Sequence, residues 1–155
     1  MTVQTGSGAT IAIGTTTAAD DAAEFAADTY TEIGEVSDSG QFGDTRQIVT
    51  WQSLADGRVR KARGSADAGD MTITVGFDGS DAGQAAVKAA FAVSSQTADE
   101  FNFRVQLNDG TVTPTTFYFR ARVTSRPMQS ITADGIVQMQ FTLAINSAIV
   151  EVDAT

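Results

Sequence analysis

Residues 30–91 read YTEIGEVSDSGQFGDTRQIVTWQSLADGRVRKARGSADAGDMTITVGFDGSDAGQAAVKAAF, and this stretch decides the fold. Asp56-Gly57 predicts a turn, and residues 58–64 would return from it as the second arm of a hairpin. Residues 65–70 are small and are expected to be flexible. The strand-like runs are separated by segments rich in Gly, Asp and Ser, which are typical of turns, and they cover residues 31–36, 45–53 and 71–77.

The run DAGQAAVKAAFAV at residues 81–93 is the clearest helix of the sequence. Ser80 is its expected N-cap. Ala85, Val87 and Phe91 give the helix a narrow apolar stripe, and the alanines between them allow a close approach to a sheet. We therefore expect the helix to lie flat against an edge or a face of a sheet.

Further along the chain, apolar and polar residues alternate with a period of two. This pattern is typical of half-buried antiparallel strands that turn one face to a core. It recurs in four runs, at residues 71–77, 101–107, 117–123 and 137–145. With the helix, these runs predict a mainly β fold: a β-sandwich or partial barrel of two antiparallel sheets with one flanking α-helix.

The ends of the chain are less regular. Residues 1–8 are expected to form a flexible N-terminal arm, and residues 148–155 a C-terminal tail. A short strand is expected at residues 9–13. Residues 15–29 are rich in Ala and Asp; we expect an ordered loop there, with a helical turn or two around Phe25 as the alternative. Nothing in the sequence separates two domains, so residues 1–155 are expected to form one.

Composition removes most catalytic chemistry. The chain has no cysteine and no histidine, which excludes disulfides and thiolate metal sites and removes the commonest general base. We expect no enzyme activity and no catalytic, cofactor-binding or metal-binding residue. The start of the chain has no signal peptide and no apolar run is long enough for a membrane span, so synthesis in the host cytoplasm is expected.

Charge is strongly acidic overall and unevenly distributed. The net charge of −9 argues against a protein that grips nucleic acid; it suits either a plain solvated surface or a surface past which DNA slides without sticking. Eight acidic residues and no Lys or Arg precede Arg46, whereas residues 46–63 hold five basic residues against the single Asp56. Two opposite patches on one subunit suit a head-to-tail contact between copies. The candidate contact residues are Arg58, Arg60, Lys61, Arg63, Asp67, Asp70, Asp20, Asp21 and Glu24.

Other patterns are weaker. Residues 78–81 and 67–70 faintly resemble calcium loops but lack the ligand spacing, and each is read more simply as a turn or a cap. Trp51, Phe25 and Tyr30 would suit a sugar-binding surface, although core or interface is commoner for such side chains. Two polar strand faces suit a wet, non-adhesive wall or plain solvent equally well: Gln138, Gln140 and Thr142, or Asn102, Arg104 and Gln106.

Taken in order, these elements resemble the major tail tube protein of long, non-contractile phage tails and the related gene transfer agents. The resemblance spans about residues 6–150. It is carried by Ile33-Gly34-Glu35-Val36 and the glycine-containing turn after it, the strand Thr45 to Ser53 with Leu54, Lys61-x-x-Gly64 followed by Asp67-x-Gly69, the strand Met71 to Phe77, the Ala-rich helix and the last three strands.

The resemblance implies a structural virion protein that forms hexameric rings stacked head to tail. Inner strands would form a continuous β-barrel around a lumen, through which genomic DNA passes at ejection without specific binding. The loop of about residues 54–70 would contact the adjacent ring, with the terminal arms assisting. The implied partners are further copies of the chain, a tape-measure protein, a tail terminator and distal tail proteins, with no membrane and no cofactor.

Two alternatives stay open. The first is a β-sandwich binding module that recognises carbohydrate or protein through its loops. The second is a tube subunit of a contractile tail or of a secretion system, because the same ring-forming domain would serve all of these assemblies.

Overall fold

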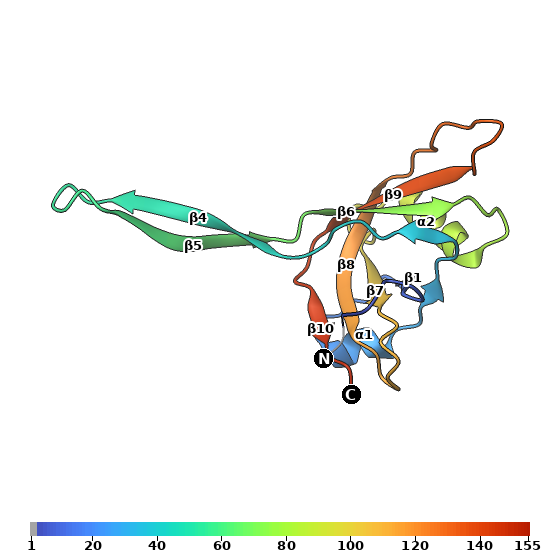
Figure 1. The fold of residues 1–155 in the computed structure, drawn as a ribbon, viewed down its shortest axis with the longest axis horizontal. Helices are drawn as coiled ribbons and strands as arrows, with labels where there is room; N and C mark the ends of the chain where they lie inside the picture. The colour runs from blue at the N-terminus through green and yellow to red at the C-terminus, as the bar shows by residue number, and fades with distance from the viewer. Residues whose placement is uncertain (1–2) are drawn as a thin grey trace.

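The computed structural model describes residues 3–155, so the first two residues of the expected arm lie outside the described residues. Its strands form a curled antiparallel sheet of eight strands and a separate two-stranded sheet (Figure 1). This confirms the predicted mainly β class with two antiparallel sheets. The elements are β1 (Thr10–Ile13), α1 (Ala22–Ala27), β2 (Thr31–Glu32), β3 (Val36–Asp38), β4 (Thr45–Gln52), β5 (Val59–Asp67), β6 (Asp70–Gly76), α2 (Ala82–Phe91), β7 (Phe101–Gln106), β8 (Thr116–Ser125), β9 (Gln138–Ile145) and β10 (Val150–Val152).

Strand order in the large sheet is β2-β1-β7-β8-β9-β6-β3, with β10 added beside β8. The long strand β8 is shared along its length: residues 116–118 pair with β10, and residues 121–125 pair with β9. In the β6–β9 ladder, Asp70 pairs with Ala144 at one end and Gly76 with Gln138 at the other.

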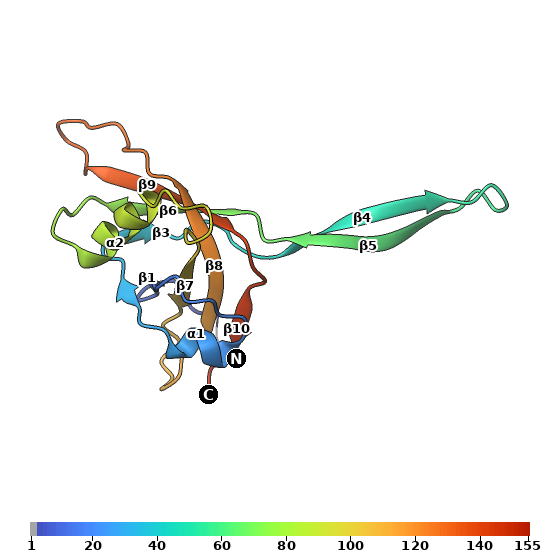
Figure 2. The same ribbon diagram turned by 180° about the vertical axis from the view of Figure 1, so that it is seen from behind.

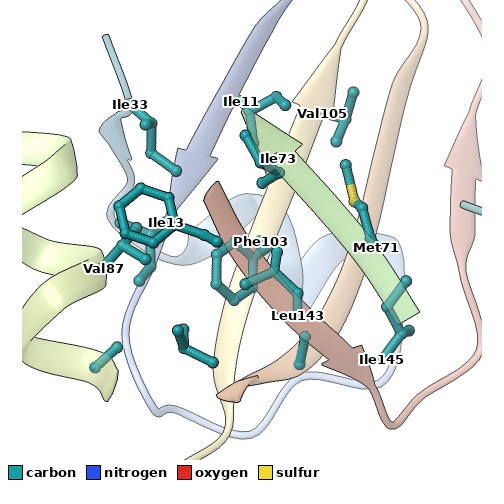
Figure 3. Packing of buried hydrophobic residues seen from close by; sticks show 14 of the residues in the cluster. Ile11, Ile13, Ile33, Met71, Ile73, Val87, Phe103, Val105, Leu143 and Ile145 are labelled. Atoms are coloured by element: carbon teal, nitrogen blue, oxygen red, sulfur yellow. The ribbon is translucent and has the colours of Figure 1, made fainter. Parts of the chain in front are cut away.

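The core lies inside the curl, where alternate side chains of the strands meet. Phe103, Phe119 and Phe141 are fully buried there, as are Met71 and its neighbours two residues apart on β6. Figure 3 shows Met71, Ile73 and Phe103 among these packed side chains, with Val87 of α2 at the side of the cluster. The period-2 alternation thus marked the inward faces of β6, β7, β8 and β9 correctly.

Helix α2 closes one side of the core, but its buried stripe differs from the predicted one. Gly83, Gln84, Val87 and Ala90 are buried, whereas Ala85 is exposed and Phe91 lies outside under the Arg126 guanidinium. The cause is the close approach at Gly83, where a Cβ atom would overlap the Glu32 carbonyl oxygen. That contact fixes which face of the helix meets the sheet.

The N-cap of α2 is Asp81 rather than Ser80. The Asp81 carboxylate accepts hydrogen bonds from the backbone N–H of Gln84 (2.8 Å) and of Gly34 (3.1 Å). Ser80 instead donates its hydroxyl to Asp78 (2.7 Å) and so closes the preceding turn. A carboxylate that satisfies two backbone donors is the better cap.

Three other segments depart from expectation. Residues 31–36 form two short strands instead of one, because Glu35 adopts a left-handed backbone conformation (φ 57°) between them. The segment 65–70 is not a flexible loop, since β5 continues to Asp67 and β6 begins at Asp70. The expected C-terminal tail contains β10, which pairs with β8.

The acidic segment 15–29 contains helix α1 instead of the ordered loop that was expected, so the alternative of a helical turn or two around Phe25 is correct. Asp21 caps the helix by accepting from the Glu24 backbone N–H (2.8 Å). Phe25 is buried against the outer side of the sheet, where its ring stacks on that of Tyr118 with centroids 5.5 Å apart. Burial of one aromatic side chain and a good cap together stabilise a helix of only six residues.

Candidate functional site

Strands β4 and β5 form a hairpin that projects far from the rest of the subunit (Figures 1 and 2). Every residue of β4 is exposed, and so is every residue of β5 except Gly64. The predicted turn at its tip is confirmed: Gly57 has a φ of 64° and donates its N–H to the Ser53 carbonyl oxygen. What resembled a loop over residues 54–70 is thus mainly the second strand of a long arm.

Both faces of the hairpin carry apolar side chains. Trp51, which is 70% exposed, pairs with Arg60 on one face, and Ile48 pairs with Arg63 on the other. Leu54 stands fully exposed at the tip. A two-stranded hairpin without a core is marginally stable in water, and exposed apolar residues on both faces are typical of a surface that another molecule covers.

The hairpin is also the most basic part of the chain. Arg60 forms an ion pair with Asp56 (2.6 Å), whereas Arg58, Lys61 and Arg63 have no carboxylate within ion-pair distance among residues 3–155. Because these cations are solvent-exposed, their field extends over roughly a Debye length and is screened by salt. The arm therefore offers apolar contact together with unpaired positive charge.

The acidic candidates lie in two places. Asp67 ends β5 and accepts the Gly69 N–H (2.9 Å), and Asp70 begins β6, so both sit at the base of the hairpin. Asp20 and the N-cap Asp21 precede α1 and Glu24 lies in its first turn, and this helix is far from the hairpin in both views (Figures 1 and 2). One subunit therefore does not bring the basic hairpin and the acidic helix together.

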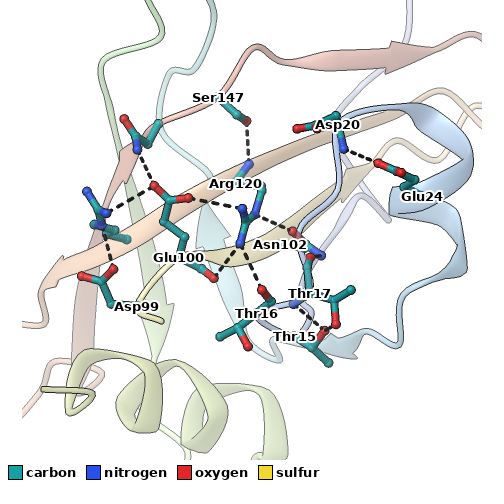
Figure 4. A network of polar contacts seen from close by, with 12 residues as sticks. Thr15, Thr16, Thr17, Asp20, Glu24, Asp99, Glu100, Asn102, Arg120 and Ser147 are labelled. Carbon is teal, nitrogen blue, oxygen red and sulfur yellow. Dashed lines mark hydrogen bonds and ion pairs between the residues drawn. The ribbon is translucent and has the colours of Figure 1, made fainter. Parts of the chain in front are cut away.

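A polar network on the outer face of β7 and β8 was not foreseen from the sequence (Figure 4). Arg120 donates to the side-chain oxygen of Asn102 (3.1 Å) and to the backbone carbonyl of Thr16 (3.1 Å). Asn102 is fully buried and donates to the Thr17 carbonyl and to Asp28, both at 2.8 Å. These bonds hold the segment that leads into α1 against the sheet.

Asp28 is the acceptor at the centre of this attachment. Burial raises the pKa of Asp28, but hydrogen bonds from Thr15, Asn102 and Thr29 outweigh burial and leave that pKa below its ordinary value. Nearby, burial and then the Asp28 charge raise the pKa of Tyr30, whose hydroxyl donates to the Phe25 carbonyl (2.8 Å). The network is thus built around an ionised carboxylate.

The outer face of β6 and β9 contrasts with the covered face of β7 and β8. Thr72 pairs with Thr142 and Thr74 with Gln140, and only Asp70, at the hairpin end, brings a charge to this ladder. These side chains are exposed or half-buried. Of the two polar faces considered in the sequence, the one through Asn102 is covered by the α1 segment, and this uncharged one is open.

The weaker sequence signals resolve into structural roles. Asp78 closes a turn and Asp81 caps α2, and among residues 3–155 no group of three or more Asp, Glu, His or Cys side chains could hold a metal ion. Trp51 lies on the hairpin, whereas Phe25 and Tyr30 pack against Tyr118. The three aromatic residues do not form one surface.

These features define a class of protein: a curled β subunit from which a long, exposed and basic hairpin projects. The family model described as phage tail tube protein, TTP, matches residues 3–154. The chain therefore belongs to the phage tail tube protein family, as the resemblance in its sequence indicated. It is a structural tube subunit of a virion or particle tail.

Solved structures share the fold at low identity. A chain in the sheath/tube terminator of the extracellular contractile injection system PVC matches with a TM-score of 0.69 at 13% identity, over 98% of each chain. The SPP1 tail tube protein matches with a TM-score of 0.63 at 15% identity, over 99% of this chain and 80% of that one. A chain of a native gene transfer agent particle gives 0.63 at 15% identity, over 97% and 99%.

A search of curated proteins found no match to the sequence. Within residues 3–155, no helix combines the length and the apolar character that crossing a membrane requires.

Proposed function

We propose that this chain assembles into hexameric rings that stack head to tail as a tail tube, and that genomic DNA passes through the tube at ejection. The observation that supports this most directly is the β4–β5 hairpin, whose apolar residues on both faces are exposed in the structure of residues 3–155. A closed stack of rings covers every such arm except at the last ring. On this reading residues 1–155 act as one structural domain, without enzyme activity and without a cofactor.

The contact between rings is proposed to use the hairpin and its base. Arg58, Lys61 and Arg63 have no ionic partner within residues 3–155, which supports a role for them toward a second copy. The full set of residues proposed for contacts between subunits, whether between rings or within one ring, is Arg58, Arg60, Lys61, Arg63, Asp67, Asp70, Asp20, Asp21 and Glu24.

The wall of the channel is proposed to be the open face of β6 and β9. This face presents Thr72, Thr74, Gln140 and Thr142, none of which carries a charge. A wall without cations does not neutralise phosphates, so DNA gains no counterion-release free energy there and slides. Assembled tubes of Thr142→Lys should retain fluorescent duplex DNA at low salt and release it at high salt, whereas parent tubes should retain none. Equal retention by both would contradict this assignment of the wall.

The proposed partners of the tube are a tape-measure protein inside it, a tail terminator at one end and distal tail proteins at the other. The subunit would be made and assembled in the host cytoplasm. A tube of a contractile system is the second candidate, because a chain from a contractile injection system shares the fold over 98% of each chain. No observation favours the carbohydrate-binding module.

Negative-stain electron microscopy of the purified protein, over a concentration series at low and high salt, tests the proposal. Hollow tubes or rings with a central channel are the expected result, with fewer assemblies at high salt. Monodisperse small particles at every concentration, even when a preformed tube end is added as a seed, would overturn it.

A further inference from the structure

The subunit has a second projection, at the opposite end of the β6–β9 ladder from the hairpin. The hairpin joins this ladder where Asp70 pairs with Ala144. The loop of residues 126–137 joins it at the other end, where Gly76 pairs with Gln138. Figures 1 and 2 show the two projections pointing away from each other. In a head-to-tail stack, opposite ends of the subunit are the surfaces that meet.

The 126–137 loop carries unpartnered apolar side chains of its own. Ile131 is 71% exposed and Ile136 is 80% exposed. Its base is held firmly: Gln140 donates its N–H to the Pro127 carbonyl, and Gln129 donates to the Gln138 carbonyl, each at 3.0 Å. The loop is therefore hydrogen-bonded to β9 at its base and exposes apolar side chains beyond it.

Charge at this end is complementary to charge on the hairpin. Glu35 and Asp134 are exposed there, and Asp78 is half-buried beside them; Glu35 is placed by the hydrogen bond from Gly76 to its carbonyl (2.8 Å). The two nearby cations, Lys88 and Arg126, lie over the rings of Phe77 (4.6 Å) and Phe91 (5.5 Å). The surface around the loop thus has an excess of carboxylates, and the hairpin has an excess of cations.

We propose that the 126–137 loop is the surface on which the tip of the β4–β5 hairpin of the next copy docks. Leu54 and its neighbours cover Ile131 and Ile136, and the hairpin cations face Glu35, Asp78 and Asp134. This inference rests on the proposed tube and names the two surfaces that meet within it. It assigns the acidic partner to this loop end rather than to α1.

The chain contains no cysteine, so site-directed cross-linking gives an unambiguous test. Leu54→Cys protein is mixed with Ile131→Cys protein under assembly conditions and treated with a flexible bis-maleimide. Matched mixtures replace Ile131→Cys with Val112→Cys, an exposed site on the β7–β8 loop, or with Ala23→Cys on α1. A heterodimer band only with Ile131→Cys is expected.

Each result assigns an outcome. Tubes that form without a Leu54–Ile131 cross-link, or with a stronger one to Ala23→Cys, overturn the inference and leave the tube intact. Absence of tubes from parent protein, even after seeding, overturns the proposed function and the inference with it. As a second measurement, Ile131→Ser should raise the critical concentration for assembly roughly tenfold, because one apolar side chain is no longer buried. An unchanged critical concentration would contradict the docking.

Discussion

Replacing Trp51 with Ala should weaken assembly while leaving the stability of the folded subunit nearly unchanged. The Trp51 side chain is 70% exposed in the subunit, so its removal creates no cavity, and the free energy of unfolding should change by less than about 0.5 kcal/mol. In the tube, the exposed part of the ring is available to be covered. A Trp side chain has roughly 250 Å² of surface to bury, so the 70% that is exposed here leaves up to about 175 Å² that a second copy can cover.

At about 25 cal/mol per Å², full covering contributes at most about 4 kcal/mol per contact, and half covering about 2 kcal/mol. The critical concentration for assembly of Trp51→Ala should therefore rise between roughly 30-fold and roughly 1,000-fold. Sedimentation of assembled material over a concentration series measures this rise, and urea denaturation of the unassembled protein measures the stability.

Val112→Ala is the control, because Val112 is also an exposed apolar residue (99%) but lies on the β7–β8 loop. A Trp51→Ala protein that assembles at the parent's critical concentration would contradict a role for Trp51 in assembly. A fall of several kcal/mol in the unfolding free energy of the variant would contradict the expected stability, because Trp51 would then belong to the fold.

Three further predictions concern the subunit itself. Gly83→Ala should destabilise the fold by about 1–3 kcal/mol although alanine favours helices, because the new methyl group meets the Glu32 carbonyl; urea denaturation would show a lower midpoint, and a gain in stability would contradict the packing described. Gln84→Leu should lower the free energy of unfolding by about 2–4 kcal/mol. The buried Gln84 amide donates to two backbone carbonyls and accepts one backbone N–H, and the substitution leaves all three groups without a partner. An unchanged thermal midpoint would show that water replaces the amide. Asp28→Asn should lower the free energy of unfolding at neutral pH and make it depend less on pH in acid. The folded pKa of Asp28 is depressed, so the stability that its carboxylate contributes is present above the unfolded pKa near 4 and is lost as pH falls through the folded pKa. Parallel curves of unfolding free energy against pH for parent and variant would contradict this.

The sequence was sufficient for the elements that have a strict period. The β6 residues Met71, Ile73 and Val75 alternate with polar ones, and burial follows that alternation. Helix α2 was predicted because its run is rich in alanine, which favours helices. The turn at Gly57 was predicted because glycine adopts a positive φ readily. These signals are local, so a single sequence contains them.

What was missed depends on contacts between distant residues. Helix α1 is fixed by Phe25 meeting Tyr118, a pairing that no local pattern announces. The buried face of α2 is determined by the close contact of Gly83 with Glu32. A search for apolar residues does not find this contact, because glycine has no side chain. For the candidate site, the basic residues were found from their clustering. The apolar side chains of the hairpin were not foreseen as exposed, because a strand-like run normally predicts burial.

The hairpin joins the rest of the subunit through two short segments, residues 39–44 and 68–69, each of which contains a glycine with a positive φ. Two strands of backbone bend far more readily than a packed core does. A stack linked by such ribbons would distribute curvature over many joints, each turning slightly while its tip stays seated. The same feature that leaves the isolated subunit with an unsupported arm would thus give the finished polymer its mechanical compliance.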